Sequence, residues 1–152
     1  MRKSTLFTLI ISLLSFVSCN QNQNSNKQAK LPENDDALER QCFKAISAKD
    51  TAFLKINNLE GKITGKLSFN FSEKNDTDGD ISGEFKGDTL IVNYIYKSGG
   101  KVFSNPFAFL KKDNKFYQGY GEIETYLGKS YFKKSTPISY EQGFVFEPAE
   151  CK

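Results

Sequence analysis

From Cys42 to its end the chain alternates apolar with polar residues, and turn-forming residues recur about every 8–12 positions. The stretch Lys62–Ser72 shows this most clearly, because one set of its alternate positions holds the apolar side chains Ile63, Leu67, Phe69 and Phe71. Successive side chains of a β-strand point to opposite faces of the sheet, so a period of two places these side chains on one face. The pattern therefore predicts an all-β domain whose strands each bury one face.

We expect about eight antiparallel strands in sequence order, joined mostly by tight turns. Such a meander can close into a barrel, which leaves no sheet edge exposed. The predicted fold is an all-β, antiparallel up-and-down meander that closes into a small calycin-like barrel, with a β-sandwich as the alternative. The segments expected to form strands are Phe43–Ala48, Thr51–Asn57, Lys62–Ser72, Asp80–Lys86, Thr89–Lys97, Lys101–Lys111, Lys115–Tyr126, Tyr131–Tyr140 and Phe144–Phe146.

Three features within these segments predict local geometry. Thr89–Lys97 is apolar on both faces, which is typical of a central strand covered on each side. Pro106 cannot donate a hydrogen bond to a neighbouring strand, so we expect an edge or a bulge there. Gly119 and Gly121 flank Tyr120 within one predicted strand and indicate a sharp bend, as the closing of a barrel requires.

The N-terminus carries a targeting signal. Arg2 and Lys3 precede the apolar run Leu6–Leu14, and small residues follow, which is the pattern of a secretory signal peptide. The apolar run is too short for a transmembrane helix, which needs roughly 20 residues. Phe16–Cys19 resembles the relaxed lipobox of Bacteroidota lipoproteins, with Phe16 where Leu is usual. The resemblance implies that Cys19 is acylated and becomes the new N-terminus, and secretion without a lipid is the alternative.

These features predict a lipoprotein signal peptide over residues 1–18, a lipidated cysteine with a polar tether over 19–41, and a β-barrel domain over 42–152. Two or more acyl chains hold a protein stably on a membrane, because each buried methylene contributes about 0.8 kcal/mol. We therefore expect a lipid anchor in the bacterial outer membrane. Asn20–Asn24 lacks the acidic run that directs some such lipoproteins to the cell surface. The domain is expected to face the periplasm, with the cell surface as the alternative.

The remaining cysteines form a pair. Export places the chain in an oxidising space, where disulfides persist. With Cys19 acylated, Cys42 and Cys151 remain at the two ends of the β-rich region. We expect a disulfide that closes a loop of about 108 residues and stabilises the fold by ~4–5 kcal/mol if the effect is one of chain entropy. Two free thiols in a redox or metal site are the alternative, but the pair has no C-x-x-C spacing and no histidine partner.

Short motifs follow one another along the domain in the order Cys42-Phe43, Ile63–Leu67, Gly83–Leu90, Ala108–Lys111, Gly119–Glu122 and Glu150–Lys152. This order resembles a family of small Bacteroidota lipoproteins. The resemblance covers most of the mature domain, and its motifs are turns, glycines and terminal cysteines. It therefore implies a β-rich fold bracketed by two cysteines and an envelope location, and it carries over no catalytic residue.

Composition excludes several classes of function. The formal net charge is +3, and Arg2 and Lys3 leave with the signal peptide, so there is no electrostatic basis for binding nucleic acid. The chain has no histidine, which removes most catalytic triads, general bases and zinc sites. We predict no enzyme activity, no catalytic residue, no metal and no cofactor.

Two acidic features have alternative interpretations. Glu122 lies among tyrosines and would serve as a general acid in glycoside hydrolysis only with a second carboxylate opposite it, which no spacing in the sequence indicates. The alternative is that Glu122 pairs with a lysine. Asp76–Asp80 departs from the EF-hand calcium loop because Gly79 comes before the sixth position, where that loop has its glycine. We expect a solvated loop there.

Aromatic residues make up 14% of the chain, and all of them are Phe or Tyr. These rings would either line an apolar pocket in the barrel or simply fill its interior. The expected function is a non-catalytic binding module for a small apolar ligand. The alternative is a protein-binding module, such as an inhibitor or assembly factor, that acts through the barrel surface. We expect a monomer on the membrane. The rings expected to line the pocket are Phe69, Phe71, Phe85, Tyr94, Phe107, Phe109, Phe116 and Tyr120.

Overall fold

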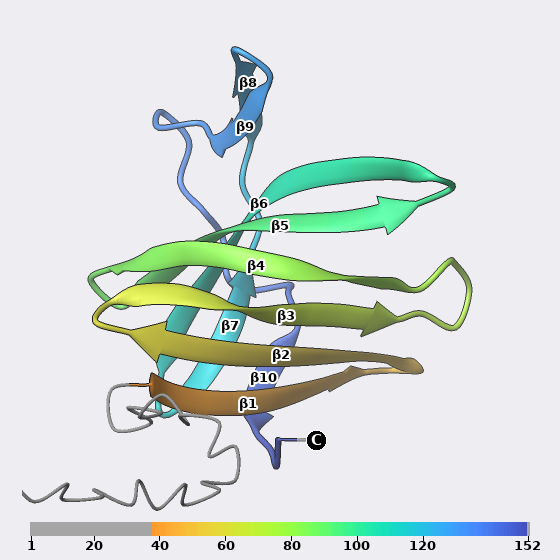
Figure 1. Ribbon diagram of the computed structural model, residues 1–152, viewed down its shortest axis with the longest axis vertical. Coiled ribbons are helices and arrows are strands. Elements are labelled where there is room, and N and C mark those ends of the chain that lie inside the picture. The colour runs from red at the N-terminus through yellow and green to blue at the C-terminus, as the bar shows by residue number, and fades with distance from the viewer. Residues whose placement is uncertain (1–37, 152) are drawn as a thin grey trace, which may run out of the picture. The chain divides into compact units, whose positions relative to one another are not determined.

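A computed structural model describes residues 38–151, and this part of the chain is all-β with no helix (Figure 1). The signal peptide, Cys19 and most of the predicted tether lie outside the described residues. The strands are β1 (Leu38–Ser47), β2 (Asp50–Leu59), β3 (Lys62–Asn70), β4 (Thr77–Lys86), β5 (Thr89–Ser98), β6 (Lys101–Lys112), β7 (Lys115–Gly119), β8 (Ile123–Tyr126), β9 (Lys129–Phe132) and β10 (Val145–Pro148).

Eight strands form a closed antiparallel barrel in the order β1-β10-β7-β6-β5-β4-β3-β2. Strands β1 to β7 follow one another as a meander, and the predicted antiparallel barrel is confirmed. The last strand of the sequence closes it, because β10 pairs with β7 at Phe146↔Phe116 and with β1 at Phe43↔Pro148. Strands β8 and β9 lie outside the barrel as a separate two-stranded sheet.

Two of the predicted strands are wrong. The segment predicted as one strand over Lys115–Tyr126 leaves the barrel after Gly119, where a Cβ atom would meet the side chains of Ile138 and Tyr140. The segment predicted as Tyr131–Tyr140 ends its strand at Phe132. The chain that follows runs irregularly and packs against these glycines, with one isolated bridge, Tyr120↔Ser139. The glycines thus mark a close approach by another segment, and the bend takes the chain away from the barrel.

The first strand begins before the predicted domain boundary. The predicted tether includes Leu38–Gln41, and this segment pairs in register with Ile56–Leu59 of β2. Its pairing has no strong signature in the sequence, because Glu39, Arg40 and Gln41 supply no apolar alternation. The adjacent strand therefore decides where the barrel begins.

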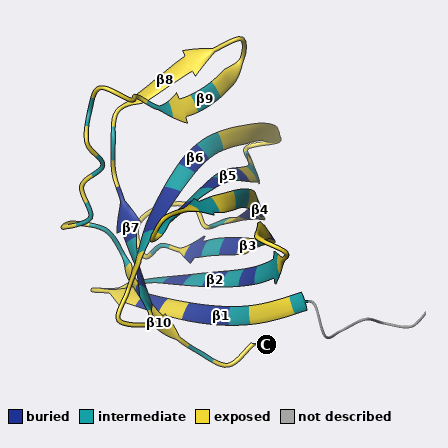
Figure 2. Ribbon diagram, turned by 90° about the vertical axis from the view of Figure 1, so that its left-hand side faces the viewer, coloured by how far each residue is buried: buried dark blue, intermediate teal, exposed yellow. Residues whose placement is uncertain are grey.

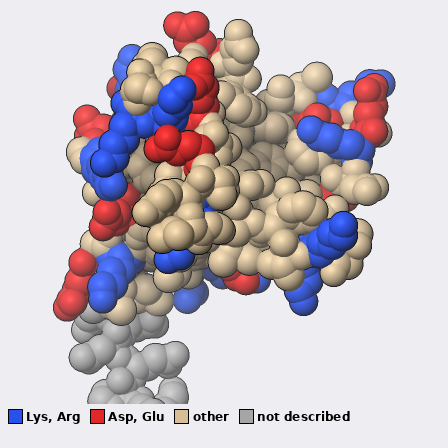
Figure 3. Space-filling view, turned by 90° about the horizontal axis from the view of Figure 1, so that it is seen from above, with Lys and Arg blue, Asp and Glu red and all other residues tan. Residues whose placement is uncertain are grey.

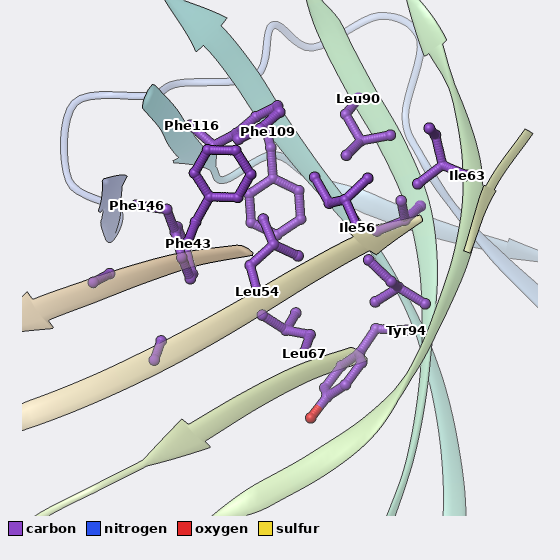
Figure 4. Packing of buried hydrophobic residues seen from close by; sticks show 14 of the residues in the cluster. Phe43, Leu54, Ile56, Ile63, Leu67, Leu90, Tyr94, Phe109, Phe116 and Phe146 are labelled. Carbon is purple, nitrogen blue, oxygen red and sulfur yellow. The ribbon is translucent and has the colours of Figure 1, made fainter. Parts of the chain in front are cut away.

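The barrel interior is filled by its own side chains (Figure 4). Alternate residues of each strand point inward, and Figure 2 shows buried and less buried residues alternating along β2, β3 and β5. Phe116 packs edge-to-face on Phe43, with ring centroids 4.9 Å apart, and Phe109 packs edge-to-face on Phe146 at 5.6 Å. Edge-to-face pairs are a favourable arrangement of aromatic quadrupoles in a close-packed interior.

The predicted disulfide is confirmed. Cys42 and Cys151 are bonded, with an S–S distance of 2.00 Å and a sequence separation of 109 residues. The backbone N–H of Ala149 also donates to the carbonyl oxygen of Cys42 at 2.8 Å. These two links hold the chain after β10 against β1, at the seam where the barrel closes.

Closure is confined to part of the barrel's length. Strands β1 to β6 have 9 to 12 residues, whereas β7 has 5 and β10 has 4. Within β6, only Ala108–Lys112 pairs with β7. The rest of the strand, Lys101–Phe107, pairs with β5 on one side alone. We call the part of the barrel beyond β7 and β10 the open half.

Candidate functional site

Four of the eight rings predicted to line a pocket are buried in the core. The exposed fraction is 4% for Phe69, 2% for Tyr94, 0% for Phe109 and 1% for Phe116. These rings contact one another or their neighbours, with Phe109 and Phe116 centroids 6.4 Å apart and Phe69 and Tyr94 centroids 6.3 Å apart. In the closed part of the barrel the aromatic side chains therefore fill the interior that a ligand would need.

Other rings remain partly exposed at the open half, and we call them the aromatic mouth. Tyr96 stacks on the buried Tyr94 at 4.8 Å and on Phe103 at 5.4 Å. Phe103 faces the inside of the curved sheet and is still 40% exposed. Two of these rings, Phe71 and Phe107, belong to the predicted set. The aromatic mouth consists of Phe71, Tyr96, Phe103, Phe107 and Phe144.

Polar groups border the aromatic mouth. The Nζ of Lys74 lies 3.9 Å from the centroid of the Phe71 ring, a cation–π contact. The hydroxyl of Tyr94 donates to Oγ1 of Thr77 at 3.1 Å, and burial raises the pKa of Tyr94 above its usual value. On the other side, the buried Gln118 accepts a hydrogen bond at 3.4 Å from the backbone N–H of Phe144.

The two remaining predicted rings lie apart from the aromatic mouth. Phe85 contacts Phe116, with ring centroids 6.2 Å apart. Tyr120 is 51% exposed and lies on the outside, beside the start of β8. The prediction of a single pocket therefore groups rings that the structure distributes among the core, the aromatic mouth and the outer surface.

The second candidate surface is the hairpin of β8 and β9, Ile123–Phe132, which we call the outer hairpin. None of its residues is buried (Figure 2). Its exposed fractions include 51% for Ile123, 70% for Tyr126, 83% for Leu127 and 48% for Tyr131. Apolar side chains at these positions add nothing to the barrel core, and they form an exposed patch of a kind that marks interaction sites.

The tip of the outer hairpin has a strained residue. Leu127 has φ 49° and Gly128 has φ 75°, and the two form the connection between the paired residues Tyr126 and Lys129. Two-residue connections of this kind favour Asn or Gly at the first position, because a Cβ atom makes the left-handed conformation unfavourable by roughly 1–2 kcal/mol. Leu127 thus adopts a conformation that is unfavourable for a residue with a Cβ atom, as Ala48 and Glu60 do at other tips of the barrel.

A groove separates the outer hairpin from the outer wall of the barrel. Its volume is about 600 Å³, and its apolar lining residues include Ile91 of β5 and Pro106 of β6. Figure 3 looks onto this end of the molecule and shows charged side chains gathered around a broad uncharged surface. The other lining residues are Gly83, Glu84, Lys86, Val92, Asn93, Ser104, Lys129, Ser130 and Tyr131.

The acidic side chains considered above as a general acid or as calcium ligands form ion pairs and hydrogen bonds within the domain. Glu122 pairs with Lys133 at 2.9 Å, which is the lysine-paired alternative. Asp76 accepts a hydrogen bond from the backbone N–H of Phe71 at 2.8 Å, and Asp80 pairs with Lys66 at 2.8 Å. Within residues 38–151 no group of three or more Cys, Asp or Glu side chains is arranged to hold a metal ion.

The same described range contains no helix long and apolar enough to cross a membrane. Comparisons with protein-family models, with curated proteins and with solved structures found no match to this chain. The candidate function therefore depends on the sequence signals and on the two surfaces described above.

The sequence analysis predicted neither the groove nor the outer hairpin as an element separate from the barrel. The signal at the tip was present, because Leu127-Gly128 between Tyr126 and Lys129 is an X-Gly connection of a tight hairpin. The groove had no such signal. It joins residues of β4, β5, β6 and β9 that are brought together only when the chain leaves the barrel after Gly119.

Proposed function

We propose that this protein is a lipid-anchored, non-catalytic module of the bacterial envelope that binds a protein partner through its outer hairpin. The observation that carries this proposal is the exposure of Tyr126 and Leu127 on an element that adds nothing to the core. Aromatic and large apolar residues dominate the binding energy of protein interfaces once they are desolvated by a partner. A partner surface would bury both side chains at once.

The conformation of Leu127 supports the same function. Gly or Asn at this position would relieve the unfavourable left-handed backbone, so folding alone favours replacement of this leucine. Burial of a leucine side chain against a partner contributes about 1.5–3 kcal/mol. This gain is of the same size as the local strain or larger, and it arises only in a complex.

The proposed anchor places the domain near partners in the envelope. It rests on the lipobox-like Phe16–Cys19 and on the signal-peptide pattern before it. About 20 residues separate Cys19 from the start of β1 at Leu38, so a lipid on Cys19 would keep the domain close to the bilayer. Such confinement raises the effective concentration of the outer hairpin towards other membrane-attached proteins.

Site-specific photocrosslinking in the native cell tests this proposal. A photoreactive phenylalanine analogue replaces Tyr126 or Leu127 in the full-length chain, and the same analogue at the exposed Thr64 of β3 is the matched control. We expect one discrete crosslinked protein from positions 126 and 127 that is absent with the control. Crosslinks only to lipid, or identical products from all three positions, would contradict a protein partner.

A second candidate function is the binding of a small apolar ligand at the aromatic mouth. It is favoured by Phe103, a ring on the concave face of the sheet that stays 40% exposed. Stacked rings with polar groups at their border suit a flat apolar molecule. Native mass spectrometry of the full-length protein from its own envelope would detect a bound mass. Phe103→Ala should reduce its occupancy, and an unchanged occupancy would exclude this site.

A further inference from the structure

Strand β9 has a free edge. The backbone N–H of Lys133 donates to the carbonyl oxygen of Glu122 at 2.8 Å, next to the pair Ile123↔Phe132. In an antiparallel pair, hydrogen-bonded residues alternate with residues whose backbone groups point the other way. The N–H and C=O groups of Ser130 and Phe132 therefore point away from β8. Within residues 38–151 no strand pairs with this edge.

The free edge borders the groove on the barrel wall. Ser130 lines the groove, and so do Ile91 and Pro106 of the barrel. Strand β9 lies beside β6 without pairing to it. A segment placed here would have backbone partners along one side and an apolar surface beneath it. Ser130 offers its backbone groups at the groove, and Phe132 continues the same edge beyond the lining residues. Alternate residues of a strand are about 6.8 Å apart, which is the spacing of a second extended chain.

The border of the groove carries more positive than negative charge. Lys86 and Lys129 both line it, and Glu84 is the single acid among the lining residues. The Oε1 atom of Glu84 lies 3.8 Å from the Nζ atom of Lys86. Among the described residues, Lys129 takes part in no ion pair. A partner with an acidic side chain near Lys129 would complement this charge.

We propose that an extended segment of a partner protein adds to β9 as a third strand and lies in this groove. The segment pairs with the backbone of Ser130 and Phe132. It places an apolar side chain on Ile91 and Pro106, and an acidic side chain near Lys129. This is strand addition, in which main-chain hydrogen bonds supply affinity and side-chain contacts supply specificity. The inference rests on the proposed function and names the class of partner segment that the outer hairpin binds.

Proline scanning of the edge tests the proposal. Ser130→Pro removes the N–H that points away from β8 and leaves the backbone hydrogen bonds between β8 and β9 intact, because proline is tolerated on the free side of an edge strand. It also removes the hydroxyl contact between Ser130 and Thr125, which is 3.3 Å long. Ser130→Ala is the matched control, since it keeps the N–H. Both are compared with the wild type as full-length protein in detergent micelles, and circular dichroism checks that each variant folds.

The probe is a phage-displayed library of random peptides selected on the wild-type protein. We expect enriched peptides with an apolar residue and an acidic residue in an extended pattern. Their affinity should fall by tenfold or more with Ser130→Pro and stay unchanged with Ser130→Ala. Binding should slow hydrogen exchange of the Ser130 and Phe132 amides. Lys129→Glu, which does not alter the backbone, should weaken the same peptides.

The outcomes separate this inference from the proposed function. Strand addition would be overturned if the selected peptides bind Ser130→Pro as tightly as the wild type. It would also be overturned if the library shows no enrichment on the wild type over Ser130→Pro. Crosslinks from positions 126 and 127 in cells would then still support a protein partner at the tip. If those crosslinks are absent while edge-dependent peptides are found, strand addition stands and the role of the tip in the proposed function fails.

Discussion

The closed part of the barrel and the outer hairpin are both antiparallel β-structure, but they use their apolar residues in opposite ways. In the barrel, Leu54, Leu90, Phe109 and Phe146 have exposed fractions of 0%. In the outer hairpin, Leu127 is 83% exposed. The difference shows that apolar side chains serve stability only where another layer covers them, and the hairpin has no such layer.

The comparison also separates the expected consequences of substitution. A change in the barrel core removes packing that the folded state needs, so it lowers the free energy of unfolding. A change at the hairpin tip removes no packing within the domain, so it should act on binding. The following predictions test this division, from the largest expected effect on stability to the smallest.

Phe109→Ala should lower the free energy of unfolding by about 3–5 kcal/mol, because it removes a fully buried ring and leaves a cavity. Denaturant unfolding followed by circular dichroism measures the change. Phe103→Ala, at a partly exposed ring of the same strand, is the control and should cost less. Equal losses at the two positions would mean that the closed part is packed no better than the open half.

Removing the Cys42–Cys151 bond should lower the free energy of unfolding by up to ~4–5 kcal/mol, because the bond closes a long loop of the unfolded chain. The double variant Cys42→Ser/Cys151→Ser is compared with the wild type in denaturant. Hydrogen exchange should rise first at β10, which the bond holds against β1. Unchanged protection there would contradict a role for the bond in closing the barrel.

Leu127→Asn should raise the free energy of unfolding by about 0.5–1 kcal/mol, because asparagine tolerates the left-handed conformation better than leucine. The same change should abolish the crosslinked product formed from position 126. Tyr126→Ser, at a position outside the left-handed region, should weaken the crosslink without the gain in stability. A loss of stability with Leu127→Asn would show that this leucine serves the fold.

The smallest effect expected is a dependence of stability on alkaline pH. Burial raises the pKa of Tyr94 in the folded protein, whereas the unfolded chain has the ordinary value of about 10. The contribution of Tyr94 is therefore complete below pH ~10 and is lost as the pH rises through the raised folded pKa. The free energy of unfolding, measured from pH 9 upward, should fall less steeply with pH in Tyr94→Phe than in the wild type. Identical slopes in both proteins would contradict this assignment.

Much of the barrel could be predicted from short patterns. The alternation at Ile63, Leu67 and Phe69 predicted an inward face, and all three side chains are buried. The pairing of Cys42 with Cys151 followed from the count and position of the cysteines, and the bond is present. These predictions succeeded because each depends on local periodicity, or on a residue type with few partners to choose from.

The candidate sites could be predicted only in part. Phe69, which alternates with the polar Ser68 and Asn70, is buried, whereas Tyr120 of the same predicted set lies on the outside. Alternation gives the face of a strand and not the length of its neighbours. The pattern therefore did not show that β7 and β10 are short, which is why Tyr96 and Phe103 were not recognised as a partly exposed pair.

The amino-acid sequence by itself determined the alternation that forms strands, the disulfide and the inward face of most strands. These features follow from neighbouring side chains and from residue chemistry. The tertiary structure alone decided which strand closes the barrel, where β1 begins and where the chain leaves the barrel at Gly119. Those features depend on contacts between segments far apart in the sequence, such as Gly119 with Ile138 and Phe116 with Phe146. The free edge of β9 and its groove belong to the same class, since they exist only when the outer hairpin lies beside β6.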